Sequence, residues 1–141
     1  MTTASKRSLR PAIVLTAEDH LLLSRTVAGA GEGMAVLAAE LARELDRARI
    51  LPEGRSSADH IRIGSGVGFR DEMSGKESKI TLVAPEHADV DAGKISVMTP
   101  VGVALIGMAA GKSIDWTTRS GDRRRLTVTE VRDPAALTMA G

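Results

Sequence analysis

The spacing of apolar residues changes once along the chain, from a helical period to a strand period. Leu21 to Val27 forms a helical run, and from Met34 to Ala48 apolar side chains recur at every third or fourth position, which places them on one face of an α-helix. From Ile61 to Val128 they alternate with polar or small residues, as strands with one buried face do. The pattern therefore predicts a helical part followed by a sheet, the α+β class.

Two helices are predicted in the first part, joined by a glycine-rich turn. Thr16 followed by Asp19 resembles a capping box with Asp in place of Glu, so the first helix should begin near Thr16. The glycines within 29–33 disfavour a helix, and the apolar spacing resumes at Met34. Because the connection is short, we predict a short antiparallel helical hairpin over residues 13–50. Each helix should be roughly 20–25 Å long.

The second part predicts a sheet with one short helix. Thr99 is a good N-cap, Pro100 suits the first helical position and Gly107 suits the position after the end, which delimits a helix of about two turns. Turns are expected at Ser74-Gly75 and Ser120-Gly121. The five expected strands lie at 61–69, 80–83, 95–97, 114–118 and 126–128.

Proline, glycine and serine between Leu51 and Asp59 predict a linker between the two parts. The expected division is a flexible tail at 1–12, the hairpin at 13–50, the linker at 51–59, the body at 60–133 and a second tail at 134–141.

Composition removes several classes of function. Lys and Arg total 19 against 18 Asp and Glu, which leaves no overall attraction to nucleic acid, so we expect no sequence-specific nucleic-acid partner. One Phe, one Trp and no Tyr provide no stacking platform for single strands. The chain has no cysteine, and no long apolar stretch follows its basic start. We therefore expect a cytoplasmic protein with neither a signal peptide nor a membrane anchor.

No set of residues forms a recognisable catalytic, cofactor or metal site, so we expect a protein that is not an enzyme. The histidines His20, His60 and His87 match no metal-binding spacing. The acidic segment 86–91 lacks the calcium-loop pattern, and we favour a solvated loop over a metal site there. The glycines at 64–68 lead into a strand, which favours a β-bulge or turn over phosphate binding.

Arg123, Arg124 and Arg125 form the densest basic run. Strand alternation sends Arg123 and Arg125 to one face and Arg124 to the other. Such a run is usually the solvated start of a strand. Its functional interpretation is a basic rim contact, made by Arg123 and Arg125, to an acidic protein or to a phosphate.

The segment from Lys94 to Trp116, KISVMTPVGVALIG followed by MAAGKSIDW, and its continuation LTVTEV resemble the C-terminal domain of the Gre transcription elongation factors. The resemblance implies an FKBP-like antiparallel sheet with one short helix. It also implies that the polymerase-binding residues are Met98, Thr99, Pro100 and Val101. Met98 stands where the cleavage factors can have an acidic residue, so we expect a hydrophobic contact at that point.

The N-terminal part resembles the Rnk family, the regulators of nucleoside diphosphate kinase, more than the Gre factors themselves, on the stretches LARELDRA from Leu41 and VGFRD from Val67. This resemblance implies a protein that binds RNA polymerase near its secondary channel without stimulating transcript cleavage, and so competes with Gre factors. We separately expect a monomer. Gre factors hold a catalytic magnesium with acidic residues at the tip of a long coiled coil. Here the hairpin tip is Gly31, Glu32 and Gly33, and Glu32 is its only carboxylate.

Two alternatives remain open. An FKBP-like body can host peptidyl-prolyl isomerase activity, although so few aromatic residues make such a pocket difficult to build. Active Gre-type transcript cleavage is the other, and it would require Glu32 to act as a metal ligand. The simpler interpretation of Glu32 is an acidic residue stabilised at the start of a helix.

Overall fold

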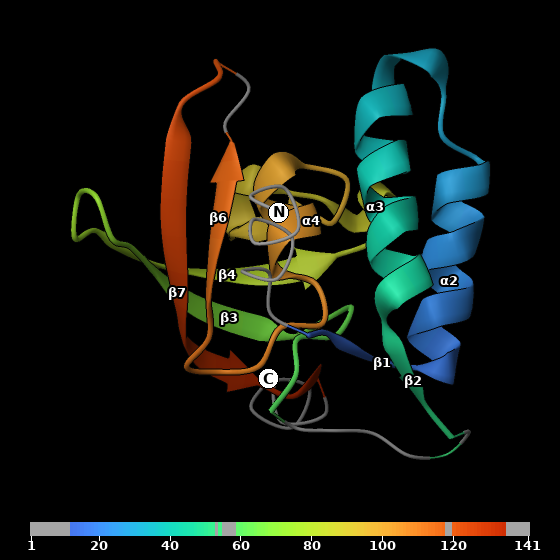
Figure 1. Cartoon of the computed structure of the whole chain (residues 1–141), viewed down its shortest axis with the longest axis horizontal. Helices are drawn as coiled ribbons and strands as arrows, with labels where there is room; N and C mark the ends of the chain where they lie inside the picture. The colour runs from blue at the N-terminus through green and yellow to red at the C-terminus, as the bar shows by residue number, and fades with distance from the viewer. Residues whose placement is uncertain (1–11, 53, 55–58, 118–119, 135–141) are drawn as a thin grey trace, which may run out of the picture.

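The computed structural model describes residues 12–52, 54, 59–117 and 120–134, and it contains a helical hairpin packed beside a sheet (Figure 1). The expected tails apart from Ala12 and Pro134, most of the linker at 51–59, and Thr118 of the expected strand 114–118 lie outside the described residues. The other predictions can be compared with the structure element by element.

The hairpin consists of α2 (Ala17–Ala28) and α3 (Ala35–Arg47), joined by a 3-10 turn at Glu32–Met34. Thr16 is the N-cap, as predicted: its Oγ1 accepts a hydrogen bond from the Asp19 backbone N–H at 3.0 Å. The second half of the expected capping box is wrong. The Asp19 carboxylate does not turn back to the cap but accepts from the backbone N–H of Ile63 at 3.1 Å.

A small parallel sheet at the base of the hairpin was not predicted. β1 (Val14–Thr16), which immediately precedes α2, pairs with β2 (Arg49–Leu51), which follows shortly after α3. Val14 N–H also donates to the Gly107 carbonyl at 3.0 Å, which ties this sheet to the body. Leu51, expected as the first linker residue, is therefore the last residue of β2. Strands of three residues are too short for an alternating pattern to show.

The main sheet has the five expected strands, in the order β5-β4-β3-β7-β6. A register shift between Gly68 and Phe69 is the bulge predicted for the glycine-rich segment. The strand bounds are β3 (Gly66–Asp71), β4 (Glu77–Val83), β5 (Lys94–Ser96), β6 (Ser113–Thr117) and β7 (Arg123–Arg132).

Two expectations about this sheet are wrong. The sheet is not wholly antiparallel, because β5 pairs with β4 in parallel. Two 3-10 turns, Pro85–His87 and Val90–Ala92, lead the chain from the end of β4 to a parallel β5. Ile61 and Ile63 do not belong to β3 either. Ile61 instead exchanges backbone hydrogen bonds with the segment after α4, donating to Met108 and accepting from Gly107.

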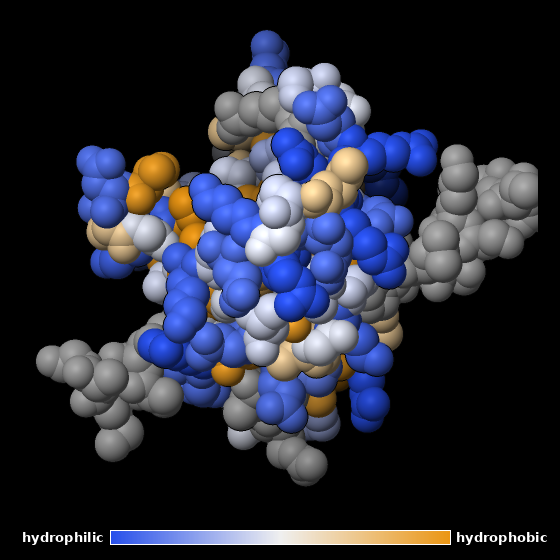
Figure 2. Space-filling view, turned by 90° about the vertical axis from the view of Figure 1, so that its left-hand side faces the viewer, coloured by the Kyte–Doolittle hydropathy of each residue, from blue (hydrophilic) through white to orange (hydrophobic). Residues whose placement is uncertain are grey.

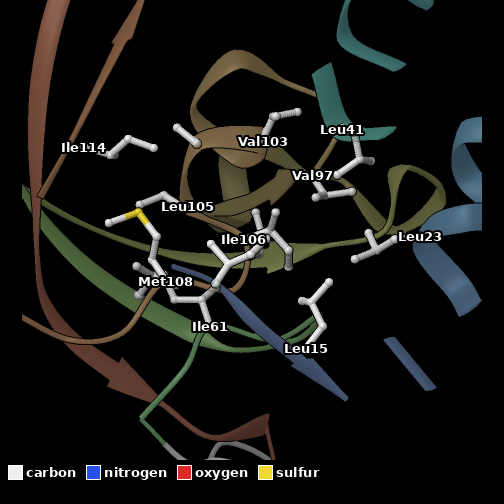
Figure 3. Close-up of a cluster of buried hydrophobic side chains, with 14 of the residues drawn as sticks. Leu15, Leu23, Leu41, Ile61, Val97, Val103, Leu105, Ile106, Met108 and Ile114 are labelled. Carbon is white, nitrogen blue, oxygen red and sulfur yellow. The ribbon is translucent and has the colours of Figure 1, made fainter. Parts of the chain in front are cut away.

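One hydrophobic core joins all these elements. Leu23 of α2 and Leu41 of α3 are fully buried in the same cluster as Val97 and Ile106 of the body. Figure 3 shows the side chains of the hairpin, β1 and the body directed toward this common interior. The hairpin is therefore part of the body's core and not a separate unit. The short helix α4 (Pro100–Leu105) packs between α3 and β6.

The contact between Gly107 and Ile13 provides a test of this packing. Gly107 and Gly111 both have positive φ, +77° and +87°, but a Cβ at Gly107 would lie 2.8 Å from the Ile13 Cβ, whereas a Cβ at Gly111 would meet nothing within 4 Å. Gly111→Ala should therefore lower the free energy of unfolding by about 1–2 kcal/mol through backbone strain alone. Gly107→Ala should lower it by roughly 1–3 kcal/mol more. Urea denaturation measures both, and equal losses would contradict the contact.

Candidate functional site

The start of α4 is a rigid corner held by hydrogen bonds. Thr99 Oγ1 accepts from the Gly102 N–H at 3.0 Å and donates to the Ser96 carbonyl at 2.8 Å. Ser96 Oγ accepts from the Met98 N–H at 2.9 Å. Thr99 is thus the predicted N-cap with Pro100 at the first helical position. These bonds fix how the chain turns from β5 into α4, so the corner presents a defined shape.

Close packing beneath the corner depends on Gly102, a residue that the sequence analysis did not single out. A Cβ at this position would lie 2.5 Å from the Ser96 carbonyl oxygen and 2.7 Å from the Val97 Cα. Only a residue without a side chain lets α4 lie so close to the end of β5. Glycine within an otherwise helical run was the available signal.

One predicted contact residue does not reach the surface. The Met98 side chain is 4% exposed and belongs to the hydrophobic core, so the expected hydrophobic contact between Met98 and a partner is wrong. Its thioether is more stable in the core than in water. Thr99, Pro100 and Val101 are each partly exposed and form the corner's outer surface. The docking role of these three residues stays a prediction.

The hairpin tip lies at the connection between α2 and α3, where Gly31, Glu32 and Gly33 are all exposed. Met34, which the apolar spacing placed on the buried face of the second helix, is 41% exposed, and it ends the 3-10 turn before α3 begins. Val36 is 73% exposed. At about 1.5 Å per residue, helices of 12 and 13 residues measure only about 18 and 20 Å.

The arginine run begins β7 and alternates as predicted. Arg124 points toward Asp71, with 3.3 Å between Nη1 and Oδ2, whereas Arg125 Nη1 lies 3.2 Å from Asp115 Oδ1 on the exposed face. Arg123 is exposed on the same face as Arg125. Figure 2 shows that hydrophilic residues cover most of this side of the molecule. A rim contact by Arg123 and Arg125 stays a prediction.

In Figure 1 the hairpin tip lies at the upper right, the start of β7 at the upper left and α4 between them near the middle of the molecule, with the small β1–β2 sheet below. α3 and α4 are packed against each other.

The acidic segment and the main sheet show neither a metal site nor an aromatic pocket among the described residues. Residues 86–91 are exposed on the two 3-10 turns, and the described residues contain no group of three or more His, Cys, Asp or Glu placed to hold a metal ion. A hollow of about 170 Å³ on the sheet is lined by glycines, aliphatic residues and charged residues, without an aromatic side chain. Phe69 and Trp116 pack against the core instead. None of the described helices is long and apolar enough to span a membrane.

Asp19 fastens the hairpin to the body. Its side chain is buried, and besides the bond from Ile63 N–H it lies 3.7 Å from Arg62 Nε. Burial raises the pKa of the Asp19 carboxyl above its ordinary value, opposed by the Ile63 N–H and by the charge of Arg62. The sequence showed Asp19 only as a helix-start acid, because Ile63 is 44 residues away along the chain.

Comparison with known proteins gives consistent matches. The family model described as "Transcription elongation factor, GreA/GreB, C-term" matches residues 56–133. "Transcription elongation factor GreA" of Azorhizobium caulinodans is 35% identical over 94 residues, 67% of this chain and 59% of that protein. GreA of Chloroflexus aggregans is 38% identical over 93 residues, 66% of this chain and 59% of that protein. The matches thus span less than two thirds of these curated relatives.

A solved structure is similar over more of the chain. The prokaryotic transcription elongation factor GreA/GreB from Nitrosomonas europaea superposes with a TM-score of 0.68 and 31% sequence identity, covering 87% of this chain and 99% of that one. The likeness therefore extends beyond residues 56–133 into the N-terminal part.

The raised pKa of Asp19 predicts how stability changes with pH. The Asp19 carboxyl ionises less readily in the folded protein than in the unfolded chain. As the pH rises, the unfolded chain therefore loses this proton first, and the free energy of unfolding decreases until the pH has passed the pKa of the folded state. Relative to Asp19→Asn, which cannot ionise, the wild type should therefore be most stable below about pH 4 and progressively less stable as the pH rises above it. Asp46→Asn, at an exposed position of α3, is the matched control. Urea unfolding across this range provides the measurement.

The cap at the start of α4 gives a second test. Thr99→Ala removes the acceptor for Gly102 N–H and should lower the free energy of unfolding by about 1 kcal/mol, whereas Thr99→Ser keeps it and should lose little. Thermal or urea unfolding of the two variants distinguishes a working cap from a passive surface residue. Equal loss in both variants would contradict the assigned hydrogen bond.

Proposed function

The chain belongs to the GreA/GreB transcription elongation factor family, and from this premise we propose that it binds RNA polymerase near the secondary channel and occupies that site without stimulating transcript cleavage. Two features together carry the proposal. The segment that the family resemblance assigns to docking lies on a rigid corner, and the hairpin is too short and has too few acidic residues to hold a catalytic magnesium ion.

Docking is proposed through the corner at the start of α4. The corner lies inside the matched residues 56–133, and Thr99, Pro100 and Val101 present partly exposed surface at a backbone turn fixed by hydrogen bonds. A rigid surface loses little conformational entropy on binding, which favours affinity. Arg123 and Arg125, at the start of β7, would add a charged rim.

Occupation without cleavage is proposed from the hairpin. Helices of about 18 and 20 Å reach much less far than a long coiled coil. The tip offers Glu32 as its single carboxylate, and a magnesium site needs several oxygen ligands. We therefore propose a factor without a resident metal or cofactor, which competes with Gre factors for the polymerase.

The finer assignments follow from the same features. A short hairpin in place of a long one favours the likeness to the Rnk family of nucleoside diphosphate kinase regulators. The FKBP-like description of the body, the monomeric state and the cytoplasmic location are proposed with it. Nothing in the described part of the chain favours the isomerase alternative, because both aromatic residues pack against the core.

Binding can be tested with two matched proline variants. Pro100 and Pro85 each stand at the start of a helical segment, where Glu is tolerated by the helix dipole. Pro100→Glu should weaken binding to core RNA polymerase at least tenfold, and Pro85→Glu, on a 3-10 turn elsewhere, should not. The measurement is a titration of labelled protein with core polymerase, repeated in the presence of a GreA factor as competitor.

The same purified protein tests the proposal that the chain does not stimulate transcript cleavage. Added to stalled elongation complexes, the wild type should leave RNA cleavage at its intrinsic rate and should reduce cleavage stimulated by GreA. Lack of polymerase binding would refute the docking proposal. Stimulated cleavage that disappears in Glu32→Gln would show an active cleavage factor instead.

A further inference from the structure

The face of the main sheet that points away from the core has a trough along its central strand. Two rows of residues cross this face from β4 through β3 to β7: Lys79, Gly68 and Glu130, then Thr81, Gly66 and Arg132. The alternate residues of the same strands, among them Val67 and Ile80, pack in or against the core. Because β3 contributes only glycine to both rows, the side chains of its neighbours form two walls and leave the floor between them open.

The volume of the trough limits what it can hold. It is a hollow of about 170 Å³. One water molecule takes up about 30 Å³ in the liquid, so the hollow has room for several waters. Sites for drug-sized ligands are larger, roughly 300–1,000 Å³. A single small polar group therefore fits the trough better than a whole nucleotide or a folded peptide does.

Two cations on opposite walls of the trough share one carboxylate. Glu130 Oε1 lies 3.5 Å from Lys79 Nζ on the β4 wall, and Glu130 Oε2 lies 3.1 Å from Arg132 Nε on the β7 wall. The Glu130 side chain crosses the glycine floor, since a Cβ at Gly68 would lie 3.2 Å from Glu130 Cγ. Among the described residues that line the trough, Glu130 is the only acidic one. One negative charge therefore balances two positive charges.

The ion pairs of Glu130 can be exchanged for those of another anion. The side chains of Lys79, Glu130 and Arg132 are 74%, 40% and 53% exposed, and ion pairs at such positions contribute little to stability. The two Glu130 oxygens mark the places where two oxygens of a bound anion would meet the same cations. Thr81 adds a donor on the β4 wall, because its hydroxyl has no hydrogen-bond partner among the described residues.

We propose that this trough binds the phosphate group of a small molecule, which displaces the Glu130 carboxylate and pairs with both Lys79 and Arg132. A phosphate monoester carries about −1.5 to −2 charges at pH 7 and so balances both cations. A free carboxylate carries one charge and offers nothing that Glu130, already held beside the cations by the chain, does not supply. The phosphodiester groups of nucleic acid also carry one charge each. The proposal is independent of binding to RNA polymerase.

Glu130→Gln tests the proposal most sharply, because removal of the competing carboxylate should strengthen binding. Inorganic phosphate is titrated into the full chain at constant ionic strength, and the amide NMR signals of Gly66 and Gly68 are followed. The dissociation constant should fall about two- to fivefold in Glu130→Gln and rise by a similar factor in Lys79→Gln, the scale of one exposed ion pair. Because these side chains are exposed, both variants should unfold at the wild-type urea midpoint.

Asp115→Asn is the matched control. Asp115 pairs with Arg125 at 3.2 Å, both side chains are more than half exposed, and neither lines the trough. This variant also removes one negative charge, but it should leave the dissociation constant for phosphate unchanged. An equal gain in Asp115→Asn and Glu130→Gln would show general charge attraction and overturn the proposal.

A second set of titrations identifies the ligand. Glycerol phosphate should shift the same glycine signals as inorganic phosphate, and the tighter of the two shows whether an ester or free phosphate is preferred. Acetate should leave these signals unchanged at the same concentration. Shifts by acetate equal to those by phosphate would overturn the requirement for two negative charges. Tighter binding of a single-stranded RNA without terminal phosphates would make nucleic acid the occupant and also overturn the proposal.

Discussion

Helices of 12 and 13 residues, the lengths of α2 and α3, are too short to be stable in water by themselves. They are stable here because Leu23 and Leu41 are buried with the body's residues in one core. Most other features of the molecule depend on this shared burial. β1 and β2 lie at the base of the hairpin because its two ends must meet the body together, and the short helix α4 is enclosed between the hairpin and the sheet.

The shared core also explains why the buried polar groups between the hairpin and the body are paired with each other. When α2 packs on the body, the Asp19 carboxylate and the Ile63 N–H lose their contact with water. Each group would destabilise the fold if the other did not pair with it. A buried carboxylate near Arg62 is a specific arrangement that a purely apolar contact would not fix. The hairpin is thereby held at one angle relative to α4, and the corner and the tip keep a constant separation.

This geometry underlies the proposal of a factor that occupies a site without catalysing in it. The rigid corner has a defined shape, and the tip has Glu32 as its single carboxylate. Because the hairpin is packed into the core of the body, it is rigid, but it does not extend far from the body. We propose that such a molecule competes with other factors of the GreA/GreB family for the polymerase and acts by excluding them.

The sequence by itself determined the elements whose signals are local. Thr16 and Thr99 begin helices because a hydroxyl can cap the N–H groups three residues onward, and the change from helical to strand spacing predicted the hairpin and the strands. Only the tertiary structure decided what depends on residues far apart: the parallel pairing of β5 with β4, the three-residue strands β1 and β2, and the bond between Asp19 and Ile63. Met98 shows the same limit. A methionine beside the Thr99-Pro100 dipeptide is equally compatible with surface and core until the packing of the whole chain encloses it.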